Sequence, residues 1–155
     1  MSNTDIDMVP PELTALTFAV EESGEAGYAS VKVTVTATIT DELSGTSFSY
    51  LLLESPSGGK YLQLSLDEWA LNSGDVNSGT YQASGFLPEF FEPGIWEVHT
   101  LYLSDSAGNH QQLSKSELVA MGLPSEITAP DIGGAVDTVP PEVTIPNVIY
   151  GTEGT

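Results

Sequence analysis

The chain contains no cysteine, and this absence removes several kinds of chemistry at once. Disulfides cannot stabilise the fold, and neither a thiolate metal site nor a cysteine nucleophile can form. If the protein works outside the cell, another device has to brace it, and metal ions are the obvious substitute.

Basic residues are almost absent as well. Against 22 acidic residues there are three lysines, Lys32, Lys60 and Lys115, which leaves a net charge of -19 and no arginine. Such a surface argues against nucleic acid and anionic membranes as partners, since both require basic surface. It favours cations. An acidic surface kept for solubility, as in a salt-adapted organism, would produce the same excess, and the two causes are compatible.

Long apolar runs are missing too. The densest cluster is residues 50–53, far below the roughly 18 residues of a membrane helix, so we expect no membrane insertion. Residues 1–7 have neither a basic nor an apolar signal-peptide region. Any targeting signal would therefore lie elsewhere in a longer protein.

What the chain does have is alternation. In residues 29–41 the apolar side chains Val31, Val33, Val35, Ala37 and Ile39 occupy every second position, with serine, lysine and threonines between them. Side chains of a strand alternate between faces, and β-branched residues suit a half-buried sheet. The segment therefore predicts a long antiparallel strand with one wet face, which ends at Asp41.

The same reasoning predicts a chain of strands with turn signals between them. The expected strands are residues 12–20, 29–41, 46–54, 61–66, 80–86, 95–105, 110–113 and 125–129, with one short helical turn at 116–121. Residues 67–78 are predicted to be irregular. In 95–105 we expect Ile95, Leu101 and Leu103 on one face and Trp96, Val98 and Tyr102 on the other. The fold class is therefore an all-β, antiparallel, immunoglobulin-like β-sandwich.

Two segments of the sequence nearly repeat each other. Residues 137–144 match residues 7–14 at an offset of 130, with six of the eight positions identical, including a Pro-Pro pair. We interpret residues 1–9 as an acidic linker, 10–130 as the sandwich domain, and 131–155 as a linker followed by the start of a second copy. Ordinary linker composition could also produce this match.

The order of several motifs resembles a known group of domains. These motifs are Asp-x-x-Pro-Pro at residue 7, Asp41–Gly45, Pro56–Gly58, Gly94-x-Trp96 and Asp105-x-x-Gly108-Asn109. Together they look like the bacterial immunoglobulin-like or cadherin-like domains that occur in tandem in large secreted and surface-anchored proteins. The resemblance implies an extracellular repeat module, often braced by calcium.

Acidic residues recur where this fold would gather them. The turns after the second and the sixth expected strands, residues 29–41 and 95–105, lie at the end of the sandwich where the chain enters. Five side chains would meet there, namely Asp5, Asp7, Asp41, Asp105 and Asn109. Clustered carboxylates repel one another unless a cation lies between them, and calcium takes six to eight oxygen ligands. We therefore predict a calcium site, with Asp131 and Asp137 as candidates for a second ion at the following junction.

Turn chemistry alone would account for the same residues, because aspartate and Gly-Asn favour turns without any metal. His99 and His110 lack partners for a zinc site, and Glu89 and Glu92 make a poor glycosidase pair. We expect no enzyme, but a structural calcium-binding spacer of an adhesin-type protein whose partners are neighbouring repeats. The rival function is a carbohydrate-binding accessory module in which Trp69 contacts glycans.

Overall fold

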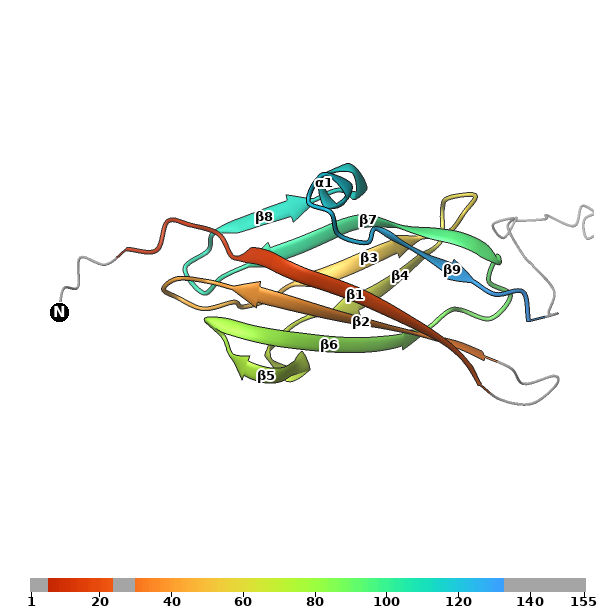
Figure 1. Cartoon of the computed structure of the whole chain (residues 1–155), viewed down its shortest axis with the longest axis horizontal. Helices are drawn as coiled ribbons and strands as arrows, with labels where there is room; N and C mark the ends of the chain where they lie inside the picture. The colour runs from red at the N-terminus through yellow and green to blue at the C-terminus, as the bar shows by residue number, and fades with distance from the viewer. Residues whose placement is uncertain (1–5, 24–29, 133–155) are drawn as a thin grey trace, which may run out of the picture.

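The computed structural model describes residues 6–23 and 30–132. Two antiparallel sheets pack face to face and form an elongated sandwich (Figure 1). The elements in chain order are β1 Glu12–Ser23, β2 Ser30–Thr40, β3 Tyr50–Glu54, β4 Tyr61–Ser65, the 3-10 helix η1 Glu68–Ala70, β5 Leu71–Asp75, β6 Ser78–Phe86, β7 Gly94–Ser104, β8 His110–Leu113, α1 Lys115–Ala120 and β9 Glu126–Ala129.

The strand order is that of an immunoglobulin-like sandwich, as the sequence predicts. One sheet has the order β1-β2-β6-β5, and the other has β4-β3-β7-β8, with β9 also paired to β7. This arrangement matches the A-B-E-D and C-F-G sheets of immunoglobulin domains, with β4 added at the edge. The 4-residue strands β8 and β9 share β7 because they pair with its opposite halves.

The predicted alternation of β2 is confirmed. Its five apolar side chains are 0–1 % exposed, and they face the second sheet. They meet the inward side chains of the opposite sheet, such as Leu51, Leu53 and Trp96, each 0 % exposed. At about 25 cal/mol per Å² of apolar area removed from water, this shared core is the main stabilising contribution of the fold.

The predicted facing of β7 is wrong, because the strand contains a bulge. Trp96 and Val98 point into the core together with Leu101 and Leu103, whereas the sequence prediction placed the two pairs on opposite faces. The pairing with β3 shifts between Leu52 and Leu53, where Val98 and Thr100 are consecutive partners and His99 is the extra residue. One extra residue reverses the alternation of a strand, so both halves of β7 bury their apolar side chains.

Residues 67–78 are also more regular than predicted. They contain η1 and β5, which pairs with β6 at the edge of the first sheet. Gly74 adopts a φ of 80°, and a Cβ there would lie 2.2 Å from the carbonyl oxygen of Ser78. A side chain at this position would collide with the backbone of β6, so the pairing of β5 with β6 requires glycine here.

The short helix forms where the sequence predicts it. Ser114 caps α1 in a capping box with Glu117, and Met121 and Gly122 end it. Among the described residues, no helix has the length and apolar character that crossing a membrane requires.

Candidate metal centre

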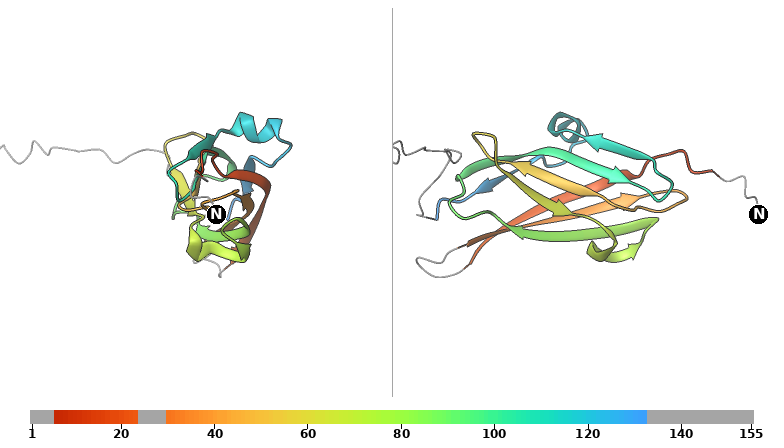
Figure 2. Two further views of the ribbon diagram at one scale, coloured as in Figure 1. Left: turned by 90° about the vertical axis from the view of Figure 1, so that its left-hand side faces the viewer. Right: turned by 180° about the vertical axis from the view of Figure 1, so that it is seen from behind.

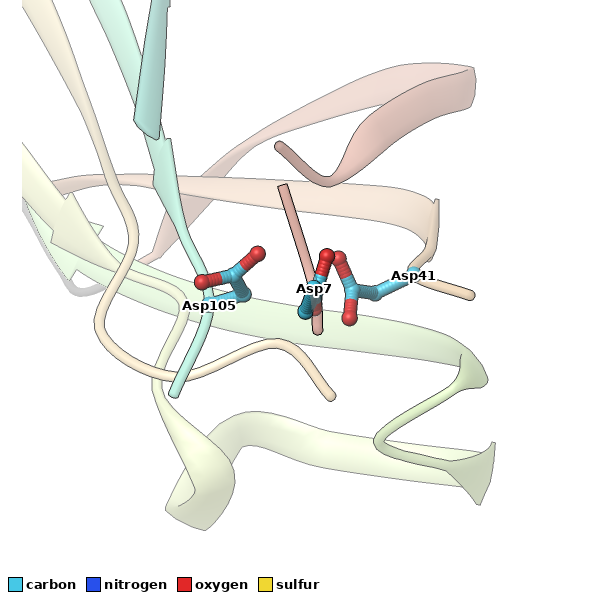
Figure 3. A group of neighbouring side chains, drawn as sticks. All are labelled: Asp7, Asp41 and Asp105. Atoms are coloured by element: carbon cyan, nitrogen blue, oxygen red, sulfur yellow. The ribbon is translucent and has the colours of Figure 1, made fainter. Parts of the chain in front are cut away.

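Three aspartates from distant parts of the chain converge at one end of the sandwich. Asp7 precedes β1, Asp41 follows β2 directly, and Asp105 follows β7 directly. One oxygen of each carboxylate lies within 4.8 Å of the others. Figure 3 shows the carboxylates of Asp7 and Asp41 meeting, with that of Asp105 facing them. We call this end the acidic pole; Figure 2, left, views the sandwich from it.

Strand direction explains the convergence. In the register of the first sheet, the end of β2 lies beside the beginning of β1, because Glu12 pairs with Thr40. An isolated bridge between Thr46 and Asp105 brings the end of β7 to the loop that follows β2. The two turns therefore lie on either side of the segment that leads into β1.

Asp7 is tied to the loop after β2. Its Oδ2 accepts hydrogen bonds from the backbone N–H and the hydroxyl of Ser44, at 2.9 and 2.5 Å, and its Oδ1 accepts one from the N–H of Val9 at 3.1 Å. These bonds stabilise the charged form and lower the pKa of Asp7 to about 2. The residue is therefore ionised at any physiological pH.

Asp41 is the most constrained of the three. Its side chain is buried, with 4 % exposed, and Oδ2 accepts one hydrogen bond from the N–H of Gly45 at 2.7 Å. Oδ1 is buried and has no hydrogen-bond partner. Burial raises the pKa of this carboxyl; the Gly45 N–H opposes the shift, and the charges of Asp7 and Asp105 add to it.

Asp105 has the surroundings of a turn aspartate. Its Oδ1 accepts from the N–H groups of Ala107 and Asn109, both at 2.9 Å, and its Oδ2 accepts from the Asn109 side-chain nitrogen at 2.9 Å. Turn chemistry therefore accounts for the position of this residue. A carboxylate has about four lone-pair sites, so one acceptor position remains for a cation.

Asn109 lies at the site, with its amide nitrogen facing the cluster. This nitrogen donates to Oδ2 of Asp105 and, at 2.8 Å, to the carbonyl oxygen of Asp7. In this arrangement Asn109 links the segments that carry Asp7 and Asp105. The atom that it directs at the carboxylates is its side-chain nitrogen, which cannot bind a cation. Gln111 strengthens the same link with a bond to the carbonyl of Pro11 at 2.8 Å.

Within the described parts of the chain, no basic side chain forms an ion pair with the three carboxylates. Lys115 pairs instead with Glu97 and Glu126, away from the cluster. At the 4.8 Å limit on their separation and an effective dielectric constant of about 20, charges on the buried Asp41 and Asp105 would repel each other by about 3.5 kcal/mol. The site therefore favours either a proton or a cation.

The remaining predicted residues lie elsewhere. Asp5 and Asp137 lie outside the described residues. Asp131 follows β9, whose last residue Ala129 pairs with Gly94 at the start of β7, so it lies at the opposite end from the cluster. Trp69 lies on η1 and is 88 % exposed.

Sequence reasoning missed Ser44 and Asn77. Ser44 positions Asp7, and the Asn77 side chain holds the loop after β2 by donating to the carbonyl of Asp41 at 2.9 Å. The sequence carried a partial signal for Ser44, which lies inside the turn segment Asp41–Gly45. It carried none for Asn77, because that residue reaches the site only through the pairing of β5, β6 and β2.

The donor set at the acidic pole is made of oxygen alone. Hard cations prefer such ligands, whereas zinc prefers histidine and cysteine, neither of which belongs to the cluster. Magnesium demands near-octahedral geometry and usually takes one or two carboxylates. The group formed by Asp7, Asp41 and Asp105 could therefore hold a hard metal ion.

Comparisons with known proteins add little to this description. No protein-family model matches the sequence, and no curated protein matches it. Among solved structures, the chain is similar to one described as "X-ray structure of Northeast Structural Genomics Consortium target SoR45". The identity is 12%, the TM-score is 0.38, and the match covers 66% of this chain and 80% of that chain. A likeness this weak carries no information on function.

Proposed function

We propose that this chain is a non-enzymatic, calcium-binding β-sandwich module that spaces functional parts of a bacterial surface or secreted protein, as immunoglobulin-like and cadherin-like repeats do. The single observation that carries the calcium site is Oδ1 of Asp41. It belongs to a buried carboxylate, it has no hydrogen-bond partner, and two further carboxylates lie within 4.8 Å. An uncompensated buried charge is costly, and a cation placed there removes the cost.

The shape of the domain supports the spacer role. The chain enters at the acidic pole, and β9 ends at the opposite end of the long axis (Figure 1). Modules joined in this way add length instead of forming a compact cluster. A calcium ion held by Asp7 would fix the entering segment to the turns after β2 and β7 and so restrict its swing.

The repeated segment supports a tandem arrangement. Residues 137–144 repeat the segment that carries Asp7, with Asp137 in the matching position, so a following copy would have the same ligand in place. Such repeats belong to extracellular proteins, where calcium is plentiful and disulfides are a common brace that this chain lacks.

Isothermal titration calorimetry tests the calcium site directly. We expect EDTA-treated protein to bind one calcium with a Kd of about 0.1–1 mM, the range of extracellular modules. Asp41→Asn should remove binding. Glu42→Gln is the matched control, because Glu42 is an exposed acid in the same loop and outside the cluster. Absence of a binding heat with the wild-type protein, or equal loss in both variants, would contradict the proposal.

One observation favours the rival function. Trp69 is 88 % exposed, the largest exposed fraction among the large hydrophobic side chains described, and exposed tryptophans can stack on sugar rings. Polysaccharide pull-down with the wild type and Trp69→Ala tests this second candidate. Binding that disappears in the variant would support it, and no binding by the wild type would exclude it for the polysaccharides tried.

A further inference from the structure

A cavity of about 560 Å³ lies between α1 and the middle of β7. Its walls come from the end of β3, from residues 97–99 of β7 and from residues 114–119, most of which belong to α1. In Figure 1, α1 lies beside β7 on the outer side of the sandwich. The volume falls within the range of about 300–1,000 Å³ that small-molecule sites occupy. The cavity is therefore large enough for a small ligand.

Three glutamates lie side by side at this cavity. Glu54 of β3 is the cross-strand partner of Glu97 of β7, and Glu97 is the partner of Glu126 of β9. Like charges at directly opposite positions destabilise a sheet. Lys115 forms ion pairs with Glu97 and, at 3.5 Å, with Glu126, but no ion pair of the described residues includes Glu54. Stability alone does not account for such a row, which indicates a role in binding.

The bulge in β7 adds a histidine at the same place. His99 is the extra residue of the bulge, and its Nδ1 lies 3.1 Å from the hydroxyl oxygen of Thr100. The ring of Tyr61 packs edge to face against His99, with the ring centroids 5.5 Å apart, and its hydroxyl donates to Glu54 at 3.2 Å. Bulges often re-aim a side chain next to a functional site. Here the contacts hold His99 in one orientation and leave its Nε2 for a ligand.

Hydrogen-bond acceptors outnumber donors in the lining. A carboxylate has about four lone-pair sites. Among the described hydrogen bonds, Glu54 accepts one from Tyr61 and Glu97 accepts one from Lys115, so most of their sites remain open. The donors are fewer, namely Lys115, His99 and the hydroxyl of Ser116. A ligand that carries many hydroxyl groups matches this lining, because each hydroxyl can both donate and accept.

Charge and apolar surface restrict the class of ligand further. The two carboxylates of the lining outnumber its single ammonium group, which disfavours phosphates, sulfates and other anions. A cationic ligand would have to lie beside Lys115, which already pairs with the central glutamate of the row. Val98 and Val119 present methyl groups at the cavity, and these suit the C–H face of a ring. A neutral sugar combines such a face with many hydroxyl groups.

We propose that this cavity binds one neutral hexose unit of a glycan, with Glu54 and Glu97 accepting hydrogen bonds from its hydroxyl groups and with His99 and Lys115 donating to its oxygens. This site uses none of the ligands of the proposed calcium site. It also differs from the exposed Trp69, which belongs to η1 and lies against β6 of the other sheet. A module with this site would hold a glycan on its side, away from the acidic pole.

An NMR titration of the amide groups of the 155-residue protein tests the site. The probes are the methyl glycosides of glucose, galactose and mannose, in both anomers, and methyl β-glucuronide as the anionic comparison. We expect at least one neutral glycoside to bind with a Kd on the order of 1 mM, as befits a ligand of this size. Its addition should shift the amide signals of residues 97–99 and 114–116. The glucuronide should bind at least about tenfold more weakly.

Matched variants locate the binding. Ser116→Trp fills the cavity from an exposed position on α1 and should abolish binding. Met121→Trp is its control, because Met121 is 45 % exposed at the end of the same helix and does not line the cavity. His99→Ala should weaken binding at least about fivefold, and His110→Ala, at the other histidine, should not. Amide spectra that match the wild type away from each substitution exclude misfolding as the cause.

The outcomes separate this inference from the other proposals. If no neutral glycoside at about 20 mM shifts the cavity amides, the proposal is wrong. Equal binding of the glucuronide, or equal losses in a variant and its control, also overturns it. Shifts confined to η1 would overturn it and favour Trp69 as the glycan contact. Calorimetry should show the same calcium affinity in Ser116→Trp and the wild type, so failure of the sugar site leaves the calcium site standing.

Discussion

Replacement of Asp41 by asparagine should give a variant that is more stable than the wild type without calcium and less stable than the wild type with calcium. Asparagine has nearly the same shape as aspartate, so its oxygen can still accept the hydrogen bond from the N–H of Gly45. This bond is 2.7 Å long in the wild-type protein. Its side chain carries no charge, so the repulsion with Asp105 and Asp7 disappears. The same change removes the one carboxylate oxygen of the cluster that is buried and without a partner.

The size of the calcium-free effect follows from the geometry. The Coulomb energy between charged Asp41 and Asp105 is about 3.5 kcal/mol at the 4.8 Å limit on their separation, with an effective dielectric constant of about 20. Partial protonation of Asp41 already relieves some of this repulsion, because burial raises its pKa. We therefore expect Asp41→Asn to stabilise the calcium-free protein by about 1–2 kcal/mol, which is about 4–8 °C in melting temperature.

The calcium-loaded effect has the opposite sign. If Kd is about 0.1 mM, calcium at about 10 mM stabilises the wild type by about 2.7 kcal/mol, or about 10 °C. The variant gains almost nothing, so the wild type becomes the more stable protein. Differential scanning calorimetry in EDTA and in calcium measures both differences, with Glu42→Gln as the control that should follow the wild type.

One result would refute the reasoning. If Asp41→Asn is less stable than the wild type in both buffers by the same amount, the carboxylate acts as an ordinary turn acceptor and not as a ligand. A calcium response that persists in the variant would lead to the same conclusion.

Three further changes probe the surroundings of the site. Gly45→Ala should destabilise the fold by about 1–3 kcal/mol and weaken calcium binding. The reason is that Gly45 has a φ of 89° and that a Cβ there would lie 2.6 Å from Cγ2 of Val76. Chemical denaturation measures the loss of stability, and calorimetry measures the loss of calcium affinity. Ser44→Ala removes the hydroxyl bond to Asp7, so calorimetry should show calcium affinity lowered about 10-fold at about pH 7 with the fold intact. In calcium-free buffer, denaturation at several pH values measures the contribution of Asp41 to stability. This contribution should be fully present below the unfolded pKa of about 3.9 and should be lost as pH rises through the raised pKa of the folded state. Asp41→Asn should abolish this decline. The Asp7 contribution has the opposite sign, being present above pH of about 3.9 and lost as pH falls towards its folded pKa of about 2.

The parts of the fold that follow local rules were predictable. The alternation in residues 29–41 predicted the buried face of β2, and a capping serine at 114 or 116 with Gly122 as terminator predicted a short helix at 116–121, which the structure places at Lys115–Ala120. The convergence of Asp7, Asp41 and Asp105 was predictable as well, because immunoglobulin-like topology places their turns at one end. These conclusions need only periodicity, capping and strand direction.

The parts that depend on tertiary pairing were not predictable. The bulge at His99 has no sequence marker, since a bulge is defined by its partner strand, and it reversed the expected facing of Trp96 and Val98. The role of Asn109 depends on which side of its amide faces Asp105, and spacing does not specify that. The regularity of β5 depends on the close approach of Gly74 to the backbone of β6, which becomes visible only when the two strands are paired.

The three aspartates also explain how a chain without disulfides can connect distant segments. Asp7 and Asp105 lie 98 positions apart in the sequence, and Asp41 lies between them. A disulfide that closed a loop of about 100 residues would restrict the unfolded chain at all times and contribute about 4.7 kcal/mol. A bound cation joins the same segments, but its contribution grows as RT ln(1 + [Ca]/Kd) and vanishes when calcium falls below Kd. The buried, unpartnered oxygen of Asp41 increases this dependence on calcium, because it lowers the stability of the calcium-free protein. With the proposed calcium site, the stability of the domain would therefore follow the calcium concentration of the surroundings.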